Sequence, residues 1–381
     1  MPTSSSAGER TGPLSGISVI ELGGIGPGAL AGMMLADLGA EVIRIERPGG
    51  PANAFLPPAA DLLNRGKKSV LLNLKRAEAV QAVLALSATA DVLIEGYRPG
   101  VAEKLGLGPE VVHGRNPRLV YGRMTGWGQD GPLAQRAGHD IGYIAITGAL
   151  HAIGDAGGPP QIPLSLVGDF GGGATYLVMG ILAALLDRGN SGEGQVVDAA
   201  IIDGANHLMV AVQALLSCGQ WVDQRGVNMF DGGCPFYSVY ATADGKHMAV
   251  GALEPAFYAE LLRHLDLDAD PDHQYDRERW PALRTALAQA FGRRTQAEWT
   301  AVFADTDACV APVLSVREAR SHPQMVARGN IIEVNGVPQP APAPRFSGYQ
   351  ARAPESPPVP GQHTSEVLAR IGIEVADLSS R

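Results

Sequence analysis

The first 125 residues alternate short β-branched runs with apolar helical patterns, and this alternation constrains the fold more than any other feature of the chain. Residues 17–22 have the composition of a strand, and a glycine-rich turn and an apolar helical pattern follow them. Further strands are predicted at residues 41–47, 69–74, 91–95 and 119–124. Strands separated by helices pair in parallel, so the pattern predicts an α/β fold with a Rossmann-like, doubly wound large domain.

The length of 381 residues predicts more than one hydrophobic core. From about residue 225 the pattern changes to hairpin-like pairs of short strands, which favours a smaller α+β domain. A proline-rich stretch over residues 337–360 predicts a strap across the surface that leads to a short last helix. We expect a flexible tail over 1–12, a large domain over 13–220, a small domain over 225–315, and a return segment over 320–381 that completes the large domain.

Composition argues against several classes of partner. The formal net charge of −9 disfavours nucleic acid and anionic membrane surfaces. The longest apolar stretches, such as residues 176–186, fall short of the ~20 residues that cross a bilayer, and no apolar signal peptide opens the chain. Three cysteines without a CxxC spacing, and histidines without ligand spacing, predict neither a disulfide framework nor a metal site. The C-terminal Ser-Ser-Arg is no peroxisomal signal, so we expect a cytoplasmic protein without a nucleic-acid or membrane partner.

The glycine-rich turn at residues 23–28 is similar to a dinucleotide-binding loop, with Glu46 at the end of the second strand where a ribose-binding acid would lie. However, Pro27 lacks an N–H for a pyrophosphate, and the spacing departs from GxGxxG. The glycines could equally serve close packing of helix on strand.

Basic residues gather near the ends of the predicted strands. They are Arg44, Arg47, Arg65, Lys67, Lys68, Lys75, Arg76, Arg98 and Lys104. Arg47 and Arg98 directly follow strands, where the ligand crevice of an open α/β sheet lies. In an acidic protein such a cluster indicates either a phosphate-rich ligand or an ordinary solvated rim.

His139 and Asp169 are the candidate catalytic pair. Each lies at the mouth of a predicted glycine-rich turn, in Gly138-His139-Asp140 and in Gly168-Asp169-Phe170-Gly171. An imidazole and a carboxyl group on opposite sides of one carbon acid could exchange a proton through it. A single histidine near a strand end is more often structural, so this spacing alone leaves both interpretations open.

Several motifs, taken together and in order, resemble the family III CoA-transferases of the CaiB/BaiF type from about residue 12 to about residue 372. They are Gly12-Pro13-Leu14-Ser15-Gly16, the strand from Glu41 to Pro48, Asn73-Leu74-Lys75, Glu95-Gly96-Tyr97-Arg98-Pro99-Gly100, Thr125-Gly126-Trp127-Gly128, Gly138-His139-Asp140, Gly168-Asp169-Phe170-Gly171-Gly172-Gly173 and Pro360-Gly361-Gln362-His363-Thr364. Within this family the chain resembles the racemase branch.

The resemblance implies interconversion of (2R)- and (2S)-2-methylacyl-CoA thioesters by 1,1-proton transfer through an enolate. It makes His139 and Asp169 the two proton carriers, and Glu254 of the partner subunit the residue that orients His139, within an interlocked homodimer. The backbone N–H of Asp140 would meet the enolate oxygen. We also expect apolar neighbours, Leu164, Leu166 and Phe170, to raise the pKa of Asp169.

The resemblance also implies that CoA is bound as part of the substrate, with no further cofactor for the chemistry. The residues it assigns to CoA are Arg47, Leu72, Asn73, Leu74, Lys75, Gly96, Tyr97, Arg98, Lys104, Gly138, Ile141, Gly142 and Tyr143. Lys104 departs from the arginine and Gly142 from the polar residue that relatives carry. Two alternatives stay open: a CoA-transferase with Asp169 as nucleophile, which His139 disfavours, and a non-catalytic acyl-CoA-binding protein.

Overall fold

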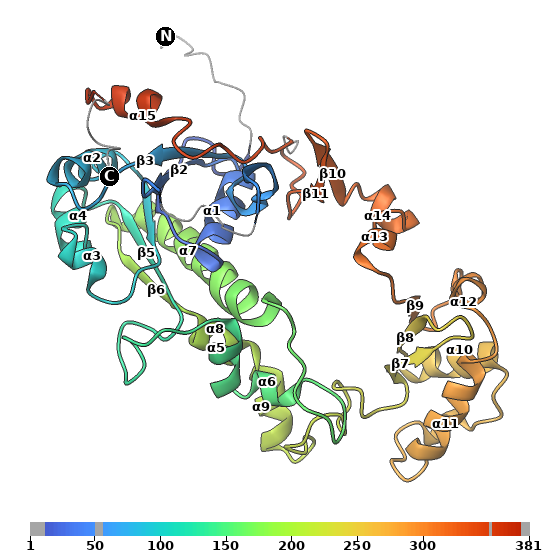
Figure 1. Cartoon of the computed structure of the whole chain (residues 1–381). Coiled ribbons are helices and arrows are strands. Elements are labelled where there is room, and N and C mark those ends of the chain that lie inside the picture. The colour runs from blue at the N-terminus through green and yellow to red at the C-terminus, as the bar shows by residue number, and fades with distance from the viewer. Residues whose placement is uncertain (1–11, 50–55, 350–352, 375–381) are drawn as a thin grey trace. The chain divides into compact units, whose positions relative to one another are not determined.

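The computed structural model describes residues 12–49, 56–349 and 353–374. The expected N-terminal tail therefore lies, except for its last residue, outside the described part. The chain divides into two compact units (Figure 1). The large unit comprises Met1–Thr147, Leu164–Leu208 and Ala327–Arg381, and the small unit comprises Gly148–Pro163 and Met209–Val326.

The large unit alternates strands and helices as predicted. Its elements are β1 (Ser18–Leu22), α1 (Pro27–Asp37), β2 (Glu41–Glu46), η1 (Pro58–Ala60), η2 (Leu62–Asn64), β3 (Lys67–Leu71), α2 (Ala77–Ser87), β4 (Val92–Glu95), α3 (Val101–Lys104), α4 (Pro109–Arg115), β5 (Val120–Thr125), α5 (Asp140–Ile146), η3 (Leu166–Ala174), α7 (Thr175–Ser191), β6 (Val196–Ala200), α8 (Ile201–Leu208), β10 (Ile331–Val334), β11 (Val337–Pro340) and α15 (Thr364–Arg370). The proline-rich strap contributes only β11, which pairs antiparallel with β10.

Six parallel strands form the main sheet in the order β3-β2-β1-β4-β5-β6. This is the doubly wound arrangement, and the strand order reverses between β1 and β4. The predicted α/β class is confirmed. In such a sheet the ligand crevice opens at the carboxyl ends of the strands on either side of that reversal.

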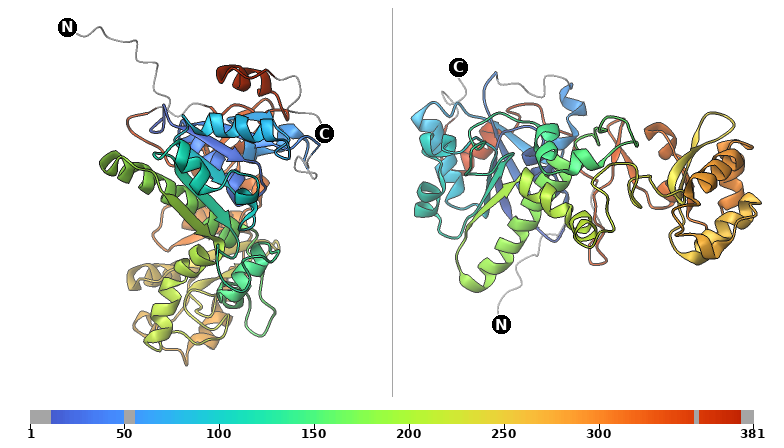
Figure 2. Two further views of the ribbon diagram at one scale, coloured as in Figure 1. Left: turned by 90° about the vertical axis from the view of Figure 1, so that its left-hand side faces the viewer. Right: turned by 90° about the horizontal axis from the view of Figure 1, so that it is seen from below.

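Helices cover both faces of the sheet, and Figure 2 gives two further views of them. On one face, Ile20, Ile43 and Val70 pack with α2, α4 and α15. On the other face, Val19 and Val42 pack with α1 and α7. Alternate residues of a strand point to opposite faces, so both faces of the central strands are covered, and the charged residues on them, such as Glu21 and Arg44, are buried.

The glycine-rich segment around Asp169 is helical rather than the expected turn. It forms a wide helical segment, η3, which continues directly into α7. Its glycines allow α8 to approach closely: a Cβ on Gly204 of α8 would lie 1.9 Å from the carbonyl oxygen of Gly172. The missing side chains therefore serve helix packing, which explains why a Gly-Gly-Gly run does not interrupt the helix.

The continuous helix from Leu166 to Ser191 has 26 residues, and by length and composition alone it could cross a membrane. The expectation that apolar stretches are too short considered only residues 176–186 and was wrong for this helix. A core helix of a soluble protein passes the same test, and Leu177, Val178 and Ile181 of α7 belong to the core on one face of the sheet.

The small unit contains an antiparallel sheet in the order β7-β8-β9, from Tyr237–Ala241, His247–Gly251 and Val310–Pro312. Its helices are α6 (Ala149–Ala152), α9 (Val210–Ser217), α10 (Pro255–Leu265), α11 (Trp280–Phe291), α12 (Gln296–Phe303), α13 (Val316–Ala319) and α14 (Pro323–Ala327), with η4 at Pro271–His273. Aromatic side chains such as Phe236, Tyr258 and Phe291 form its core.

The boundaries of the units differ from those expected from the sequence. Residues 148–163, 209–220 and 316–326 belong to the small unit. The apolar helical stretch of residues 201–217 is interrupted at Met209, between α8 and α9. The chain passes from one compact unit to the other at this interruption.

Candidate active site

Two cavities open at the carboxyl ends of the strands of the large unit. The first, of about 500 Å³, lies at the ends of β1, β4 and β5, and both His139 and Asp169 line it. The second, of about 660 Å³, lies at the ends of β2 and β3. Gly24, Ile25 and Tyr97 line both. We call them the reaction cavity and the nucleotide cavity, and their common wall makes them neighbours.

His139 immediately precedes α5 in an extended conformation, and its side chain is exposed. Its ring forms no hydrogen bond within the described part of the chain. A neutral imidazole without such a bond keeps its acceptor nitrogen available for a proton. The ring of His139 lines the reaction cavity and is open to a ligand there.

Asp169 lies in η3, and its carboxyl group is in the wall of the reaction cavity. Burial and, to a smaller extent, the charge of Asp140 raise the pKa of this carboxyl, His139 lowers it, and the net result is a pKa of about 6. The predicted direction is confirmed, but two of the three predicted apolar neighbours are wrong: Leu164 and Leu166 are 72% and 60% exposed. Gly26 lies close to the carboxyl group instead, because a Cβ built on it would be 3.5 Å from Oδ2 of Asp169.

The buried side chain of Asp140 contacts the same segment. Its Oδ1 accepts a hydrogen bond of 2.7 Å from the backbone N–H of Asp169. This contact requires a glycine at position 168, since a Cβ there would lie 2.3 Å from Oδ1 of Asp140. The backbone N–H of Asp140, the predicted enolate donor, has no acceptor within the described residues. The side chain thus has a structural and electrostatic function that the motif did not reveal.

Tyr143 supports the loop that carries His139. Its ring packs edge-on against Trp127, with centroids 4.7 Å apart. A Cβ on Gly138 would lie 2.5 Å from the Tyr143 ring, so the glycine before His139 permits this approach. Burial raises the pKa of the Tyr143 hydroxyl, and the nearby charge of Asp169 adds to the effect.

Most residues assigned to CoA line one of the two cavities. Arg47, Leu72, Asn73, Leu74 and Lys75 line the nucleotide cavity. Gly96, Tyr97, Arg98, Gly138 and Tyr143 line the reaction cavity. Lys104, Ile141 and Gly142 line neither of them. Lys104 is exposed at the end of α3, so its assignment to CoA has no support from the cavities.

The basic residues near the strand ends divide into two groups. Several are neutralised inside the large unit: Arg44 by Glu21 and Glu46, Arg65 by Asp37, Lys67 by Glu21, and Lys68 by Glu41 and Glu366. Arg47, Lys75 and Arg98 also line the cavities, as Arg44 does, but they form no ion pair within the described residues. Of the two interpretations that the sequence left open, a phosphate-rich ligand therefore fits Arg47, Lys75 and Arg98 and not the paired cations, whose carboxylate partners the sequence does not show.

Glu254 belongs to the small unit, where it precedes α10 and is exposed. Pro255 starts this helix, and Glu254 has the extended conformation usual before a proline. Within the described residues its side chain forms no hydrogen bond or ion pair, so it is available to a second group.

The sequence analysis missed several residues of the reaction cavity, among them Glu21, Trp127 and Arg136. Glu21 could have been found from the sequence, because a carboxylate within a strand that is buried on both faces requires a partner of opposite charge or a hydrogen-bond donor. Among residues 12–49, 56–349 and 353–374, no three His, Cys, Asp or Glu side chains are grouped as a metal site would need.

Residues 14–364 match the CoA-transferase family III, and the chain belongs to this family. It is 43% identical over 369 residues to the alpha-methylacyl-CoA racemase of Mus musculus, across 96% of this chain and 95% of that protein. It is 41% identical over 378 residues to the enzyme of the same name from Homo sapiens, across 96% of both chains. A CAIB/BAIF family protein from Brucella suis superposes with a TM-score of 0.82 at 26% identity, covering 95% of this chain and 100% of that one.

Proposed function

We propose that the protein is a racemase that interconverts the (2R) and (2S) forms of 2-methylacyl-CoA thioesters by 1,1-proton transfer. The observation that carries the proposal is that one cavity of the large unit is lined by both His139 and Asp169. Relatives 41–43% identical over nearly the whole chain are named alpha-methylacyl-CoA racemases. CoA enters as part of the substrate, and the reaction uses protein side chains as its acid and base.

The pKa of Asp169 suits this chemistry. A carboxyl group with a pKa of about 6 exists in both protonation states near neutral pH. In one direction, neutral His139 removes the α-proton while protonated Asp169 delivers a proton to the opposite face of the carbon. In the other direction the ionised carboxylate removes the proton and the imidazolium returns one. One mobile proton is thus shared by the pair, and no net proton is consumed.

The enolate formed between the two transfers carries negative charge on the thioester oxygen. Stabilisation of this charge by a hydrogen-bond donor lowers the barrier more than any other single contribution. The backbone N–H of Asp140, which has no acceptor within the described residues, is the proposed donor. The nucleotide cavity would hold the CoA nucleotide, with Arg47 and Lys75 as the cations for its phosphates.

The decisive experiment incubates the protein with a 2-methylacyl-CoA thioester in heavy water. Deuterium is expected at the α-carbon together with loss of optical purity. His139→Ala should reduce both by orders of magnitude, whereas His113→Ala is a suitable control because this ring bonds the carbonyl of Leu119 away from both cavities. Unchanged exchange in His139→Ala would refute the assignment.

A CoA-transferase activity is the second candidate, because the matched family bears that name and the Asp169 carboxylate lies in the cavity wall. It predicts a thioester on Asp169 that hydroxylamine traps, and transfer of CoA between acids. CoA binding with neither reaction would indicate a non-catalytic binding protein.

We also propose that two copies of the chain form a homodimer. Helix α9 is largely apolar, yet none of its residues is buried, and Leu164, Leu166, Met179 and Leu186 of the large unit are exposed. Apolar surface of this extent is usually covered by another protein. Glu254 of the partner subunit would then be the residue that orients His139. Sedimentation analysis at micromolar concentration should give twice the mass of the 39.8 kDa chain.

A further inference from the structure

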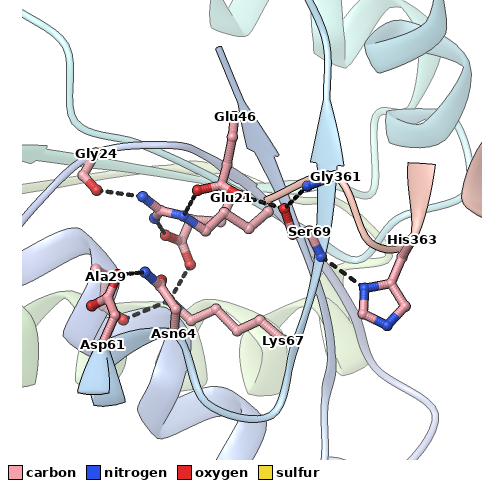
Figure 3. A network of polar contacts seen from close by, with 11 residues as sticks. Glu21, Gly24, Ala29, Glu46, Asp61, Asn64, Lys67, Ser69, Gly361 and His363 are labelled. Atoms are coloured by element: carbon pink, nitrogen blue, oxygen red, sulfur yellow. Dashed lines mark hydrogen bonds and ion pairs between the residues drawn. The ribbon is translucent and has the colours of Figure 1, made fainter. Parts of the chain in front are cut away.

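A group of charged side chains, which the proposed reaction does not use, lies beside the two cavities: Glu21 lines the reaction cavity, and Arg44 and Glu46 line the nucleotide cavity. Arg44 of β2 is opposite Glu21 of β1 and opposite Ser69 of β3 in the sheet register. Laterally paired residues point to the same face, so these three side chains all project to one side of the sheet. Figure 3 shows the group, with Glu21, Glu46 and Ser69 labelled.

Arg44 is the centre of this network. Its Nη1 pairs with Glu21, its Nε lies 3.2 Å from Oε1 of Glu46, and its Nη2 donates a hydrogen bond of 2.7 Å to the carbonyl oxygen of Gly24. The residue is only 8% exposed. Two carboxylates therefore balance its charge, and the remaining contact is to the backbone of the glycine-rich loop.

Both carboxylates are themselves held in place. Lys67 lies with its Nζ 2.7 Å from Oε2 of Glu21 and donates 2.8 Å to the carbonyl oxygen of Ala29 in α1. The Ser69 hydroxyl bonds Glu46 and accepts a 2.7 Å hydrogen bond from the N–H of Gly361 (Figure 3). The guanidinium group of Arg44 is thus held by Glu21 and by Glu46, and it can in turn hold the carbonyl of Gly24 in the glycine-rich loop.

The loop that Arg44 holds reaches the catalytic carboxyl group. Gly24, Ile25 and Gly26 line the reaction cavity, and Gly26 adopts φ +67° and ψ −124°, which essentially only glycine adopts. A Cβ built on Gly26 would lie 3.5 Å from Oδ2 of Asp169, an ordinary van der Waals distance, so the loop lies beside the carboxyl group with room for about a methyl group between them. A displacement of Gly24 would therefore change the space beside the Asp169 carboxyl group and its access to water.

We propose that Arg44 is a positioning residue: by holding the carbonyl of Gly24 it keeps the loop of residues 24–26 beside Asp169, and this loop limits the space and the water around the carboxyl group during proton transfer. Proton transfer rests on the proposed function, whereas the position of the loop beside Asp169 does not. The rival interpretation is that Arg44, which also lines the nucleotide cavity, binds a CoA phosphate directly. The two carboxylates at its guanidinium group disfavour this, because they already neutralise the cation.

The test compares Arg44→Lys with Arg65→Lys. Lysine keeps the positive charge but cannot reach two carboxylates and a carbonyl in a fixed fork. Arg65 is the matched control: it is also buried in the large unit, pairs with Asp37 at 2.6 Å, and donates 2.6 Å to a backbone carbonyl, but it lines neither cavity.

Two measurements are expected to separate the variants. Arg44→Lys should lower kcat for α-proton exchange about 10- to 100-fold while the Kd for CoA changes less than about twofold, because a change in the space and the water around a catalytic group affects the chemical step. The pKa of Asp169, followed by carbon-13 NMR of its carboxyl group and assigned with Asp169→Asn, should fall toward the ordinary range as water gains access. Arg65→Lys should leave both quantities close to the wild type.

A weaker Kd for CoA with unchanged kcat would identify Arg44 as a direct ligand and overturn the proposal, as would unchanged kcat together with an unchanged Asp169 titration. If Arg44→Lys does not fold, Gly26→Ala is the second test of the proposal, because it strains the same loop. An unchanged kcat together with an unchanged titration of Asp169 in that variant would also overturn the proposal. Absence of α-exchange in the wild type would remove the racemase function alone, since the NMR titration still tests whether Arg44 positions the loop beside Asp169.

Discussion

Asp140→Asn should separate the two causes that raise the pKa of Asp169. Asparagine retains an oxygen that can accept the 2.7 Å hydrogen bond from the N–H of Asp169, so the segment should keep its geometry. The variant removes the negative charge, which is the second cause of the raised pKa after burial. Removal of a like charge favours the ionised form, so the pKa of Asp169 should fall.

The order of magnitude follows from the causes of the shift. The pKa of Asp169 is raised from 3.8 to about 6, and burial contributes more to this rise than the charge of Asp140. Asp140→Asn should therefore lower the pKa by about 1, to about 5. At pH 6 the protonated fraction of the carboxyl would fall from about one half to about one tenth.

Two assays measure this change. Carbon-13 NMR of the Asp169 carboxyl group gives the titration directly. The acid limb of the pH profile of kcat/KM should move to lower pH by the same amount, because it reports the first proton lost by the coupled pair. An unmoved titration, or a move to higher pH, would show that the charge of Asp140 does not act on Asp169 and would refute the electrostatic argument.

Three further changes have defined outcomes. Gly204→Ala places a Cβ 1.9 Å from a carbonyl oxygen of η3 and should lower the free energy of unfolding by about 1–3 kcal/mol in chemical denaturation. The control Gly189→Ala, whose Cβ would meet no atom within 4 Å, should be neutral or stabilising. Equal effects of the two substitutions would contradict the packing argument. Asp169→Asn removes a carboxyl group whose pKa is raised in the folded state, so the wild type should lose stability relative to the variant as pH rises from about 3.8 through about 6. The full effect of ~3 kcal/mol is halved for partial solvent screening, which leaves about 1.5 kcal/mol. Parallel curves of unfolding free energy against pH for the two proteins would refute this. Arg47→Ala should raise the Kd for CoA about tenfold in calorimetry, and Lys104→Ala should not, because of these two residues only Arg47 lines the nucleotide cavity. A larger loss of affinity for CoA in Lys104→Ala than in Arg47→Ala would support the assignment of Lys104 to CoA.

The parallel sheet could be predicted from the sequence because strands such as β1 and β2 are rich in Val and Ile and alternate along the chain with helices. The helical state of the Asp169 segment could not be predicted in this way. A run of three glycines opposes helix formation by local propensity, and close tertiary packing, as between Gly204 and Gly172, offsets that cost. The break at Met209 leaves no local signal either, since its apolar neighbours continue the helical pattern.

The candidate site was predicted unevenly. His139 and Asp169 were found from their motifs, and they line one cavity. The sequence could not show that Arg44 and Lys67 face Glu21, because cross-strand partners depend on the register of strands that are distant in sequence. Neither could it show that Leu164 and Leu166, which were expected to bury the carboxyl group, are largely exposed.

The charges beside the two cavities also restrict how the strands can pair during folding. A shift of β2 by one residue against β1 would turn Arg44 and Glu46 toward the face of the sheet that carries Ile20 and Ile43, which is an apolar core. An unpaired ion in such a layer costs several kcal/mol, so misregistered sheets are strongly disfavoured. A variant with apolar residues of similar size at Arg44 and Glu46 would lack this penalty. It should refold to a mixture of strand registers between β1 and β2.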